Sequence, residues 1–343
     1  MSKKFLLTMG AIVVIVFGLI AWHLLFNVEP YGSEEVRLAV EFTDHAACAF
    51  IAKQKGFFKG NGLNVTAFDC YITGTALAAA LSREDIDAAY ICLIPAICTY
   101  ANAKVPIKIV AGAHEYGYAL VVNQNKVRTV KDLENPDVVI ACMQKGTSTE
   151  VLLRKMIERY GLNEDSILSR VRYMNPPLAL LSLEMGQIDA AFLPEQYPTM
   201  AEELGFKVLL TAQNVWPNML GSVLVVKESL IKNRPDVVEK LVKATIQGTR
   251  YIYDNPSDAA QIVAEELKIA GKQVLPSDVA DIAAKLEITP RIISKSLSTR
   301  VMCTNNVNLT TVQEVIDYVA RLGYIECFKA EEILDLNFLE GLT

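Results

Sequence analysis

Close cysteine pairs and histidine-rich segments are missing from this sequence, which argues against a metal centre. Of its 343 residues, three are histidines, and none of the seven cysteines belongs to a Cys-x-x-Cys pair. Structural zinc sites need Cys and His side chains at short, regular spacings. No phosphate-binding loop is recognisable either, and no nucleophile stands beside an identifiable base. We therefore expect no metal, no cofactor, no catalytic residue and no enzymatic activity.

Runs of positive charge are also lacking. The 33 Lys and Arg residues are outnumbered by 39 Asp and Glu residues, which gives a formal net charge of −6. A protein that binds along nucleic acid needs a basic patch. Nucleic acid is therefore not an expected partner. A chain of 343 residues with 52% hydrophobic content is long enough for two packed lobes.

One long hydrophobic run is present, at the N-terminus. Lysines at positions 3 and 4 precede residues 5–26, which are apolar with few breaks, and acidic residues follow. As a helix this run is about 33 Å long, enough for a hydrocarbon core of about 30 Å. The positive-inside rule then places the rest of the chain outside the cytoplasm. Because no clear cleavage site or lipid-accepting cysteine follows, residues 1–30 are predicted to be an uncleaved anchor rather than a removed signal peptide.

Beyond the anchor, short apolar runs alternate with helix-length segments, a pattern typical of βαβ units. We therefore predict an α/β fold with two mainly parallel sheets flanked by helices. Strands are predicted at 36–42, 63–68, 87–91, 107–111, 118–123, 138–142, 171–174, 189–193, 207–211 and 221–226. Helices are predicted at 46–55, 75–82, 95–103, 148–160, 177–185, 236–253, 257–267, 277–286 and 310–322.

A short internal repeat indicates two related lobes. Residues 86–90 and 188–192 both read Ile-Asp-Ala-Ala-aromatic, and each follows a predicted helix and precedes a proline. The C-terminal part is rich in predicted helices and contains no new strand series, so we expect it to pack back on the first lobe. The predicted division is residues 36–121 and 222–343 for lobe 1 and residues 122–221 for lobe 2. Two strand-like crossings would then form a hinge beside a ligand-binding cleft.

Four segments carry a recognisable combination of motifs. They are Ala-Lys-Gln-Lys-Gly-Phe-Phe at 52–58 with Gly-Leu-Asn-Val at 62–65, Ala-Lys-Val-Pro-Ile at 103–107, Lys-Gly-Thr-Ser-Thr at 145–149, and the run at 186–197 that begins Gly-Gln-Ile-Asp-Ala-Ala. Together they resemble the ABC importer binding proteins for nitrate, sulfonates, taurine and thiamine-precursor pyrimidines.

The resemblance implies a type 2 periplasmic-binding-protein fold and an extracytoplasmic location, at the cell surface or in the periplasm. It also implies a small-molecule solute, ABC permease and ATPase subunits as partners, and action as a monomer. A tethered ligand sensor is the alternative, because an anchor suits a sensor equally well. A pyrimidine-synthesising enzyme on the same fold is a further alternative, which the apparent export segment disfavours.

Polar residues at the carboxyl ends of strands are the candidate ligand contacts, because ligands of open α/β folds bind there. The first-lobe candidates are Thr43, Asp44, His45, Tyr71, Thr73, Gly74, Thr75, Cys92 and Tyr116. The second-lobe candidates are Gly146, Thr147, Ser148, Asn175, Glu195, Gln196 and Trp216. Each has an ordinary structural role as its alternative: Thr43 and Asp44 are typical helix N-caps, and a tyrosine beside a strand usually packs.

The class of solute stays open between two types. The helix start at 146–149 suits an oxyanion such as a sulfonate, because free backbone N–H groups and the helix dipole favour negative charge. Against this, Thr147-x-x-Glu150 also reads as a capping box, which would use part of the same donor set and add a carboxylate. The candidate loops contain no arginine fork. A sulfonate or taurine-like solute and a thiamine-precursor pyrimidine are therefore predicted on equal terms, with nitrate below both.

Overall fold

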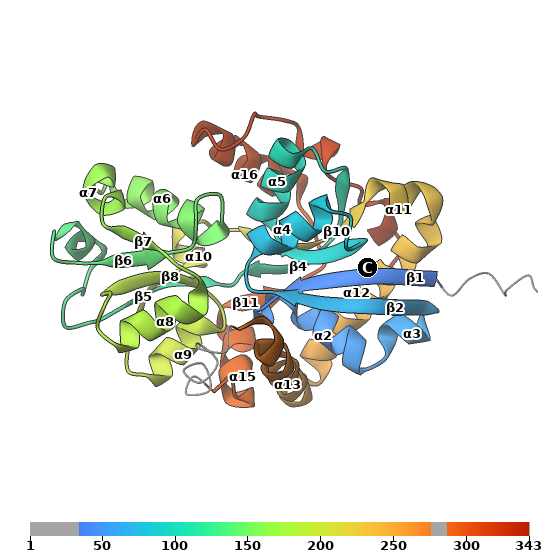
Figure 1. Ribbon diagram of the computed structural model, residues 1–343, viewed down its shortest axis with the longest axis horizontal. Coiled ribbons are helices and arrows are strands. Elements are labelled where there is room, and N and C mark those ends of the chain that lie inside the picture. Colours follow the sequence, from blue (N-terminus) through green and yellow to red (C-terminus); the bar gives the residue numbers. More distant parts are fainter. Residues whose placement is uncertain (1–33, 276–286, 343) are drawn as a thin grey trace, which may run out of the picture.

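The computed structural model of the chain describes residues 34–275 and 287–342. The predicted anchor at 1–30 and the predicted helix at 277–286 lie outside these ranges. Within them, no helix has the length and apolar character needed to cross a membrane. Two β-sheets lie side by side along the long axis, each with helices on both faces (Figure 1).

The first sheet has six strands in the order β11-β4-β10-β3-β1-β2. The bounds are β1 (Glu34–Glu41), β2 (Leu63–Tyr71), β3 (Ala88–Cys92), β4 (Ile107–Tyr116), β10 (Leu220–Lys227) and β11 (Val301–Cys303). Strand β1 pairs in parallel with β2 and β3, whereas β10 runs antiparallel to β3 and β4, and β11 runs antiparallel to β4.

The second sheet has five strands in the order β7-β6-β8-β5-β9. The bounds are β5 (Tyr118–Val122), β6 (Ile140–Cys142), β7 (Val171–Tyr173), β8 (Ala190–Pro194) and β9 (Lys207–Thr211). Strand β6 is parallel to β7 and β8, and β5 is antiparallel to β8 and β9. Strand β5 thus pairs in the second sheet, although the predicted lobe bound at residue 121 assigned most of it to the first lobe. The lobe bounds themselves stay a prediction.

The prediction of mainly parallel sheets holds in part: four of the described strands of each sheet run in one direction, but β10 and β11 in the first sheet and β5 in the second run against them. The reason is the path of the chain. Strand β4 ends at the junction between the sheets, and β10 re-enters the first sheet from that junction, so these neighbours run in opposite directions. Strand β5 likewise enters the second sheet from the junction and runs against β8. A two-crossing connection therefore creates antiparallel pairs that local sequence patterns do not reveal.

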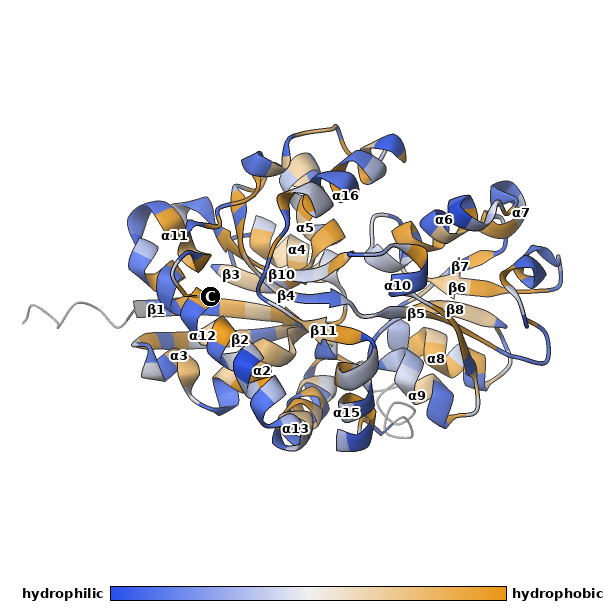
Figure 2. Ribbon diagram, turned by 180° about the vertical axis from the view of Figure 1, so that it is seen from behind, coloured by the Kyte–Doolittle hydropathy of each residue, from blue (hydrophilic) through white to orange (hydrophobic). Residues whose placement is uncertain are grey.

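Helices cover both faces of each sheet and bury two apolar clusters. Around the first sheet lie α2 (Ala47–Gln54), α3 (Phe57–Gly60), α4 (Gly74–Ser82), α5 (Leu93–Ala103), α11 (Glu228–Asn233), α12 (Pro235–Asp254), α13 (Pro256–Val274), α15 (Pro290–Thr299) and α16 (Leu309–Arg321). Around the second lie α6 (Ser148–Tyr160), α7 (Glu164–Leu168), α8 (Pro176–Glu184), α9 (Tyr197–Glu203) and α10 (Ala212–Val215). Figure 2 shows largely apolar strands between these helices.

Strand β1 shows how the sequence builds these layers. Leu38 and Val40 point into the apolar cluster beneath α2 and α12, and Ala39, between them, joins the cluster beneath α4 and α5. Side chains of a strand alternate between its two faces, and a sheet covered on both faces needs apolar residues at every position. This explains why the strands appear in the sequence as continuous apolar runs.

Close packing of α12 on α2 depends on Gly248. A Cβ at this position would lie 2.2 Å from the Cys48 carbonyl oxygen, which is backbone and cannot move aside alone. We expect Gly248→Ala to lower the free energy of unfolding by about 1–3 kcal/mol, as overpacked cores do. Gly60→Ala is the matched control, because nothing lies within 4 Å of its would-be Cβ. Urea unfolding of both variants measures this, and equal midpoints would contradict the account of the helix contact.

Candidate functional site

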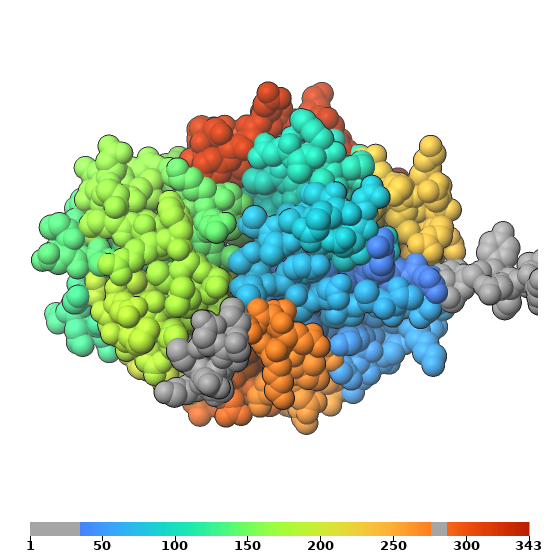
Figure 3. Space-filling model, in the orientation of Figure 1, coloured from blue at the N-terminus to red at the C-terminus, as the bar shows by residue number. Residues whose placement is uncertain are grey.

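Polar residues at the ends of first-sheet strands lie against the segment where the chain crosses into the second sheet. Glu41 ends β1, Cys92 ends β3, and the crossing runs through Gly117 between β4 and β5. We call the following residues the junction cluster: Glu41, His45, Cys92, His114, Tyr118 and Ser222. All are at most 5% exposed. Figure 3 shows the surfaces of the two parts of the molecule in contact along the boundary between them.

Cys92 is the centre of the junction cluster. Its backbone N–H donates to Glu41 Oε1 at 2.7 Å, and its thiol lies 3.1 Å from Glu41 Oε2. The Tyr118 hydroxyl donates to Cys92 Sγ at 2.9 Å. Burial raises the pKa of the Cys92 thiol well above its usual value, and the Glu41 carboxyl raises it further. The thiol therefore stays protonated, which makes it a hydrogen-bonding group rather than a nucleophile.

Two histidines lie beside Gly117, where the chain crosses between the sheets. His45 Nε2 lies 2.7 Å from the Gly117 carbonyl oxygen and so donates to it, which leaves Nδ1 as an acceptor. His114 Nε2 lies 3.0 Å from Ser222 Oγ, and the two ring centroids are 4.2 Å apart. Burial lowers the pKa of His114 to about 4, and burial together with His114 holds the pKa of His45 well below its usual value. Both imidazoles are therefore neutral near pH 7.

These neutral histidines predict a loss of stability in mild acid. His114 titrates near 4 when folded and near 6.5 when unfolded, so the unfolded chain binds more protons between these values. The free energy of unfolding is therefore unaffected by His114 above about pH 6.5 and decreases as the pH falls toward 4. At pH 5 the decrease is about 2 kcal/mol. His114→Gln should remove this part of the pH dependence while keeping a partner for Ser222. Unfolding free energies at pH 7 and pH 5 measure it; an unchanged pH dependence in the variant would contradict it.

The glycines of the two crossings make room for these rings. A Cβ at Gly117 would lie 2.7 Å from His45 Nε2, and a Cβ at Gly221 would lie 2.1 Å from His114 Cε1. Gly117 also has φ +78°, a left-handed conformation that favours glycine. The close approach of both crossings to the histidines therefore requires glycine at these positions.

Three buried side chains beside the junction cluster have polar atoms without a hydrogen-bond partner. Both carboxyl oxygens of Asp44, the hydroxyl of Ser148 and both amide atoms of Gln196 are unpaired. Their residues are 0%, 3% and 0% exposed. An unpaired buried polar group costs about 1–3 kcal/mol, so a fold keeps such a set where something else supplies the bonds. We call these residues the unpaired set.

The unpaired set brings both lobes to one place. Asp44 precedes His45 in the 3-10 turn Asp44–Ala46 after β1, and Gln196 follows β8 of the second sheet. Ser148 opens α6 and lies near the Tyr118 hydroxyl. Burial raises the pKa of Tyr118, and the Ser148 hydroxyl lowers it. The ring of Tyr118 in turn lies 4.9 Å from that of His45. The unpaired set therefore draws on both lobes, with Asp44 from the first and Ser148 and Gln196 from the second.

Asp44 is the titratable member of the unpaired set. Burial and, to a smaller extent, the Glu195 carboxylate together raise its pKa to about 8, against the opposing influence of Ser296 and Arg300. The Ser296 hydroxyl lies close enough to lower the pKa of Asp44 but makes no well-formed hydrogen bond with either carboxyl oxygen. At neutral pH Asp44 is therefore mainly a carboxylic acid, which offers one donor beside one acceptor.

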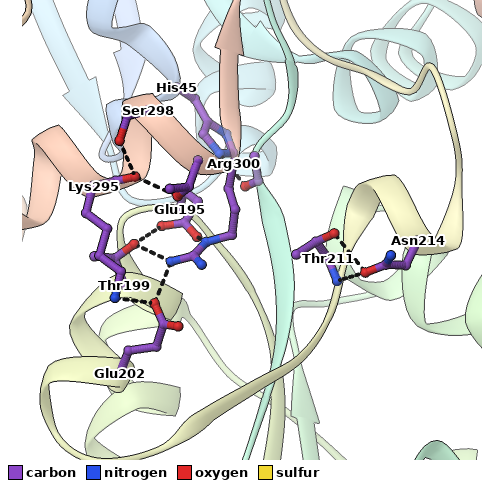
Figure 4. A network of polar contacts seen from close by, with 11 residues as sticks. His45, Glu195, Thr199, Glu202, Thr211, Asn214, Lys295, Ser298 and Arg300 are labelled. Carbon is purple, nitrogen blue, oxygen red and sulfur yellow. Dashed lines mark hydrogen bonds and ion pairs between the residues drawn. The ribbon is translucent and has the colours of Figure 1, made fainter.

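Glu195 and Gln196 occupy neighbouring positions but have different roles. Glu195 is ion-paired with Arg300, whose guanidinium also donates to Thr199 Oγ1 and Glu202 Oε2, both at 2.7 Å (Figure 4). Glu202 also pairs with Lys295 at 2.9 Å. We call this group the interlobe latch: Glu195, Thr199, Glu202, Lys295 and Arg300. Its cations lie in α15 and at the C-cap of α15, beside the first sheet, whereas its acids lie in α9 and in the loop before α9, beside the second sheet.

The predicted capping box at the start of α6 is wrong. Thr147 is the N-cap residue, but its side chain makes no capping hydrogen bond and instead donates to the Gln144 carbonyl oxygen at 2.7 Å. Glu150 Oε1 accepts from Arg154 Nε at 2.5 Å and from the Tyr324 hydroxyl at 2.6 Å. Glu150 is 0% exposed, and a buried carboxylate is stabilised by a cationic partner, whereas the Thr147 N–H already donates to the Gln144 carbonyl oxygen at 3.2 Å.

Several other predicted site residues have structural contacts. Thr43, Thr73 and Asn175 are N-caps, whose side chains accept from the backbone N–H groups of His45, Ala76 and Leu178 respectively. Trp216 is not brought to the junction cluster, because its ring packs on Tyr318 at 5.2 Å between centroids. For Thr43, which was predicted as a ligand contact, a cap or both, the cap is confirmed and the contact stays a prediction.

The remaining predicted residues lie around the junction. Gly74 opens α4 so close to Glu41 that a Cβ would be 2.6 Å from Oε1. Thr75 and Gly146 line a cavity of about 420 Å³ between the lobes, and Tyr71 is half-buried at the end of β2. Tyr116 lines a different cavity of about 500 Å³.

Sequence patterns missed the contribution of the C-terminal segment. Ser296 and Arg300 come from α15 and its C-cap, far along the chain from the strands whose ends form the site. They arrive there because β11, a strand of three residues, pairs with the end of β4. No local motif marks either residue, and so short a strand has no recognisable alternation.

Two mixed sheets joined by two crossings make a two-lobed protein with the periplasmic-binding-protein fold. More specifically, the sequence pattern of the NMT1-like family matches residues 29–268, and the chain belongs to this family. The family resemblance inferred from the sequence is confirmed.

Comparisons with individual proteins agree on the fold. The chain resembles the periplasmic nitrate-binding protein NrtA of Synechocystis (TM-score 0.73, 14% identity, 91% of this chain and 88% of that one). It also resembles the alkanesulfonate-binding protein SsuA of Xanthomonas axonopodis bound to MOPS (TM-score 0.71, 15% identity, 88% and 98%). A ligand-binding component of an ABC-type import system from Staphylococcus aureus is similar too (TM-score 0.72, 15% identity, 90% and 99%).

One curated relative is much longer than this chain. Over 268 residues the sequence is 23% identical to the bicarbonate transport ATP-binding protein CmpC of a Synechocystis strain. The match covers 73% of this chain but 39% of that protein.

Proposed function

We propose that this protein is the extracytoplasmic solute-binding component of an ABC importer, which captures a small polar solute between its lobes and delivers it to a permease served by an ATPase. Membership of the NMT1-like family and likeness in fold to nitrate-binding and sulfonate-binding proteins support the proposal. The observation that carries it is the unpaired set, whose buried polar atoms lack the partners that a bound solute would supply.

The charges around the unpaired set favour a solute that brings N–H donors over an anion. Two arginines around the site are already paired: Arg300 with Glu195 and Glu202, and Arg154 with Glu150. Oxyanions such as nitrate, bicarbonate or a sulfonate are usually recognised by Arg, Lys or several free N–H groups. Buried acids beside paired arginines therefore disfavour them.

An aminopyrimidine of the thiamine-precursor type fits the same groups. A neutral Asp44 acid and the Gln196 amide each place a donor beside an acceptor. An aminopyrimidine carries the complementary pair, a ring nitrogen beside an amino group, and forms two parallel hydrogen bonds with such a partner. We therefore place the pyrimidine above a sulfonate or taurine-like solute, which the sequence alone did not separate.

Binding rather than catalysis is the function that the junction cluster supports. Its one thiol, Cys92, is protonated and donates toward Glu41, and His45 Nδ1 lies 3.8 Å from Sγ, too far for proton abstraction as it stands. The role as an importer component entails an extracytoplasmic location and action as a monomer. The anchor at 1–30 stays a prediction from the sequence.

Thermal unfolding of the full chain against a panel of solutes tests the proposal. The panel contains aminopyrimidines, taurine, alkanesulfonates, nitrate and bicarbonate, each titrated separately. A ligand at about 100 times its Kd stabilises the folded state by about 2.7 kcal/mol, which is readily measured. We expect an aminopyrimidine to raise the melting temperature and the anions to leave it unchanged. A rise with an anion alone would overturn the assignment of solute class, and a flat panel would count against solute capture itself.

A further inference from the structure

The interlobe latch meets the chain crossing at Gly117. The Gly117 N–H donates to the Arg300 carbonyl oxygen at 2.9 Å, and the Gly117 carbonyl oxygen accepts from the Glu195 N–H at 2.8 Å. The same carbonyl oxygen accepts from His45 Nε2 at 2.7 Å. The side chains of Glu195 and Arg300 form an ion pair with each other. The crossing residue and these two latch residues are therefore bonded pairwise, in a closed ring of contacts.

This ring joins the two lobes at the point where one would turn against the other. Arg300 precedes β11 of the first sheet, Glu195 follows β8 of the second sheet, and Gly117 lies between β4 and β5. Rotation of one lobe against the other about Gly117 separates Glu195 from Arg300, or turns the Gly117 peptide away from one of its partners. The lobes therefore part here only if at least one contact of the ring breaks.

The contact between the lobes continues from the crossing toward the surface. Arg300 donates to Glu202 Oε2 at 2.7 Å, and Lys295 pairs with Glu202 at 2.9 Å (Figure 4). Arg291 of α15 and Glu203 of α9 follow at 3.3 Å. The side chains of Glu202 and Glu203 are 25% and 35% exposed, so the pairs lie progressively nearer to solvent. Cations on the first-lobe side thus face acids on the second-lobe side along the whole series.

Contact between the lobes also hides the unpaired set from solvent. The carboxyl oxygens of Asp44, the hydroxyl of Ser148 and the amide atoms of Gln196 are all buried. In this arrangement no molecule in solution reaches these atoms, so a solute binds there only after the lobes have parted. Gln196 is next to Glu195 in the chain, and a movement that separates Glu195 from Arg300 carries Gln196 with it. Breaking the latch therefore opens the second-lobe side of the unpaired set.

We propose that the interlobe latch is the gate of the binding site: it holds the lobes in contact, and its breaking about Gly117 is the step that admits the solute. The inference rests on the proposed function for the role of the site, but its test uses the protein alone. A gate of this kind has two consequences. The lobes part without unfolding of the chain, and weakening the latch increases the population of the parted form.

Native-state amide hydrogen exchange of the full chain, without solute, tests the gate. The Gly117 and Glu195 amides report parting of the lobes because both donate within the ring, and the Leu38 amide in β1 reports global unfolding. We expect Gly117 and Glu195 to exchange faster than Leu38 and to respond less steeply to urea, because parting of the lobes exposes less surface than unfolding. Glu202→Gln should speed their exchange about five- to tenfold, since it removes the charge that pairs with both latch cations.

Glu158→Gln is the matched control. Glu158 pairs with Arg321 and also joins the lobes, but both side chains are more than half exposed. An exposed pair contributes little, so exchange at Gly117 and Glu195 should change by less than about twofold in this variant.

Two results would overturn the proposal. Equal rates and equal urea slopes for Gly117, Glu195 and Leu38 would show that the lobes do not part before the chain unfolds. Exchange at Gly117 that Glu202→Gln leaves unchanged would show that parting does not break the latch. A flat solute panel would count against solute capture but would leave these rates as they are, so failure of the proposed function and failure of the gate are distinguishable.

Discussion

Replacing Arg300 with leucine should lower the free energy of unfolding by about 3–5 kcal/mol, among the largest effects of any single substitution in this chain. Arg300 is 8% exposed and Glu195 is 0% exposed, so the substitution leaves a carboxylate buried without its counter-ion. Burial already raises the pKa of Glu195 despite the opposing effect of Arg300. Without the arginine, Glu195 must take up a proton or draw the second lobe away from the first.

Three further variants separate this effect from ordinary loss of a salt bridge. Arg321→Leu removes another ion pair between the lobes, with Glu158, but both side chains are more than half exposed and the expected change is below about 1 kcal/mol. Arg300→Lys keeps the charge and loses the fork that contacts Glu195 and Glu202, so it should be intermediate. Adding Glu195→Gln to Arg300→Leu should restore part of the stability, because no charge is then stranded.

Urea unfolding of the four variants in parallel measures the latch. If the free energy of unfolding of Arg300→Leu stays within about 1 kcal/mol of the wild-type value, the latch contributes no more than an exposed surface ion pair does. A loss that Glu195→Gln does not reduce would point instead to the packing of the arginine stem.

The contrast between Thr43–His45 and Arg300 shows how far local sequence carries the site. The first strand has an apolar centre at residues 38–40, and the polar residues that follow the strand lie at the junction as the rule for strand ends requires. Arg300 follows an ordinary amphipathic helix, and nothing in its neighbours marks it as buried. Its position follows from the pairing of β11 with β4, a long-range contact that depends on the whole fold.

The strand directions and Glu150 illustrate the same limit. Apolar runs predicted where most strands lie, but the antiparallel pairs come from the two crossings and not from any run itself. The spacing Thr147-x-x-Glu150 is typical of a capping box, yet Glu150 turns to Arg154 and Tyr324, and Tyr324 is contributed by the C-terminal segment. Local rules hold until a residue distant in sequence offers a stronger partner.

Asp44 carries the largest expected effect on solute binding. Asp44→Leu should weaken binding of the aminopyrimidine by about a hundredfold, the loss of two hydrogen bonds of about 1.4 kcal/mol each. Asp44→Asn should keep binding within about tenfold, because its amide also places a donor beside an acceptor. Above the pKa of Asp44 a sulfonate bound near it would behave differently, since both substitutions then remove a negative charge and would strengthen its binding.

The pH dependence of binding separates the neutral acid from a carboxylate. If the solute binds the protonated form, affinity is constant below the pKa of about 8 and falls tenfold for each pH unit above it. Asp44→Asn cannot ionise, so its affinity should stay level through the same range. Isothermal titration between pH 6 and pH 10 compares the two. Affinity that instead rises with pH in the wild type would show that Asp44 binds as the carboxylate, to a cationic solute, and would overturn the neutral pairing.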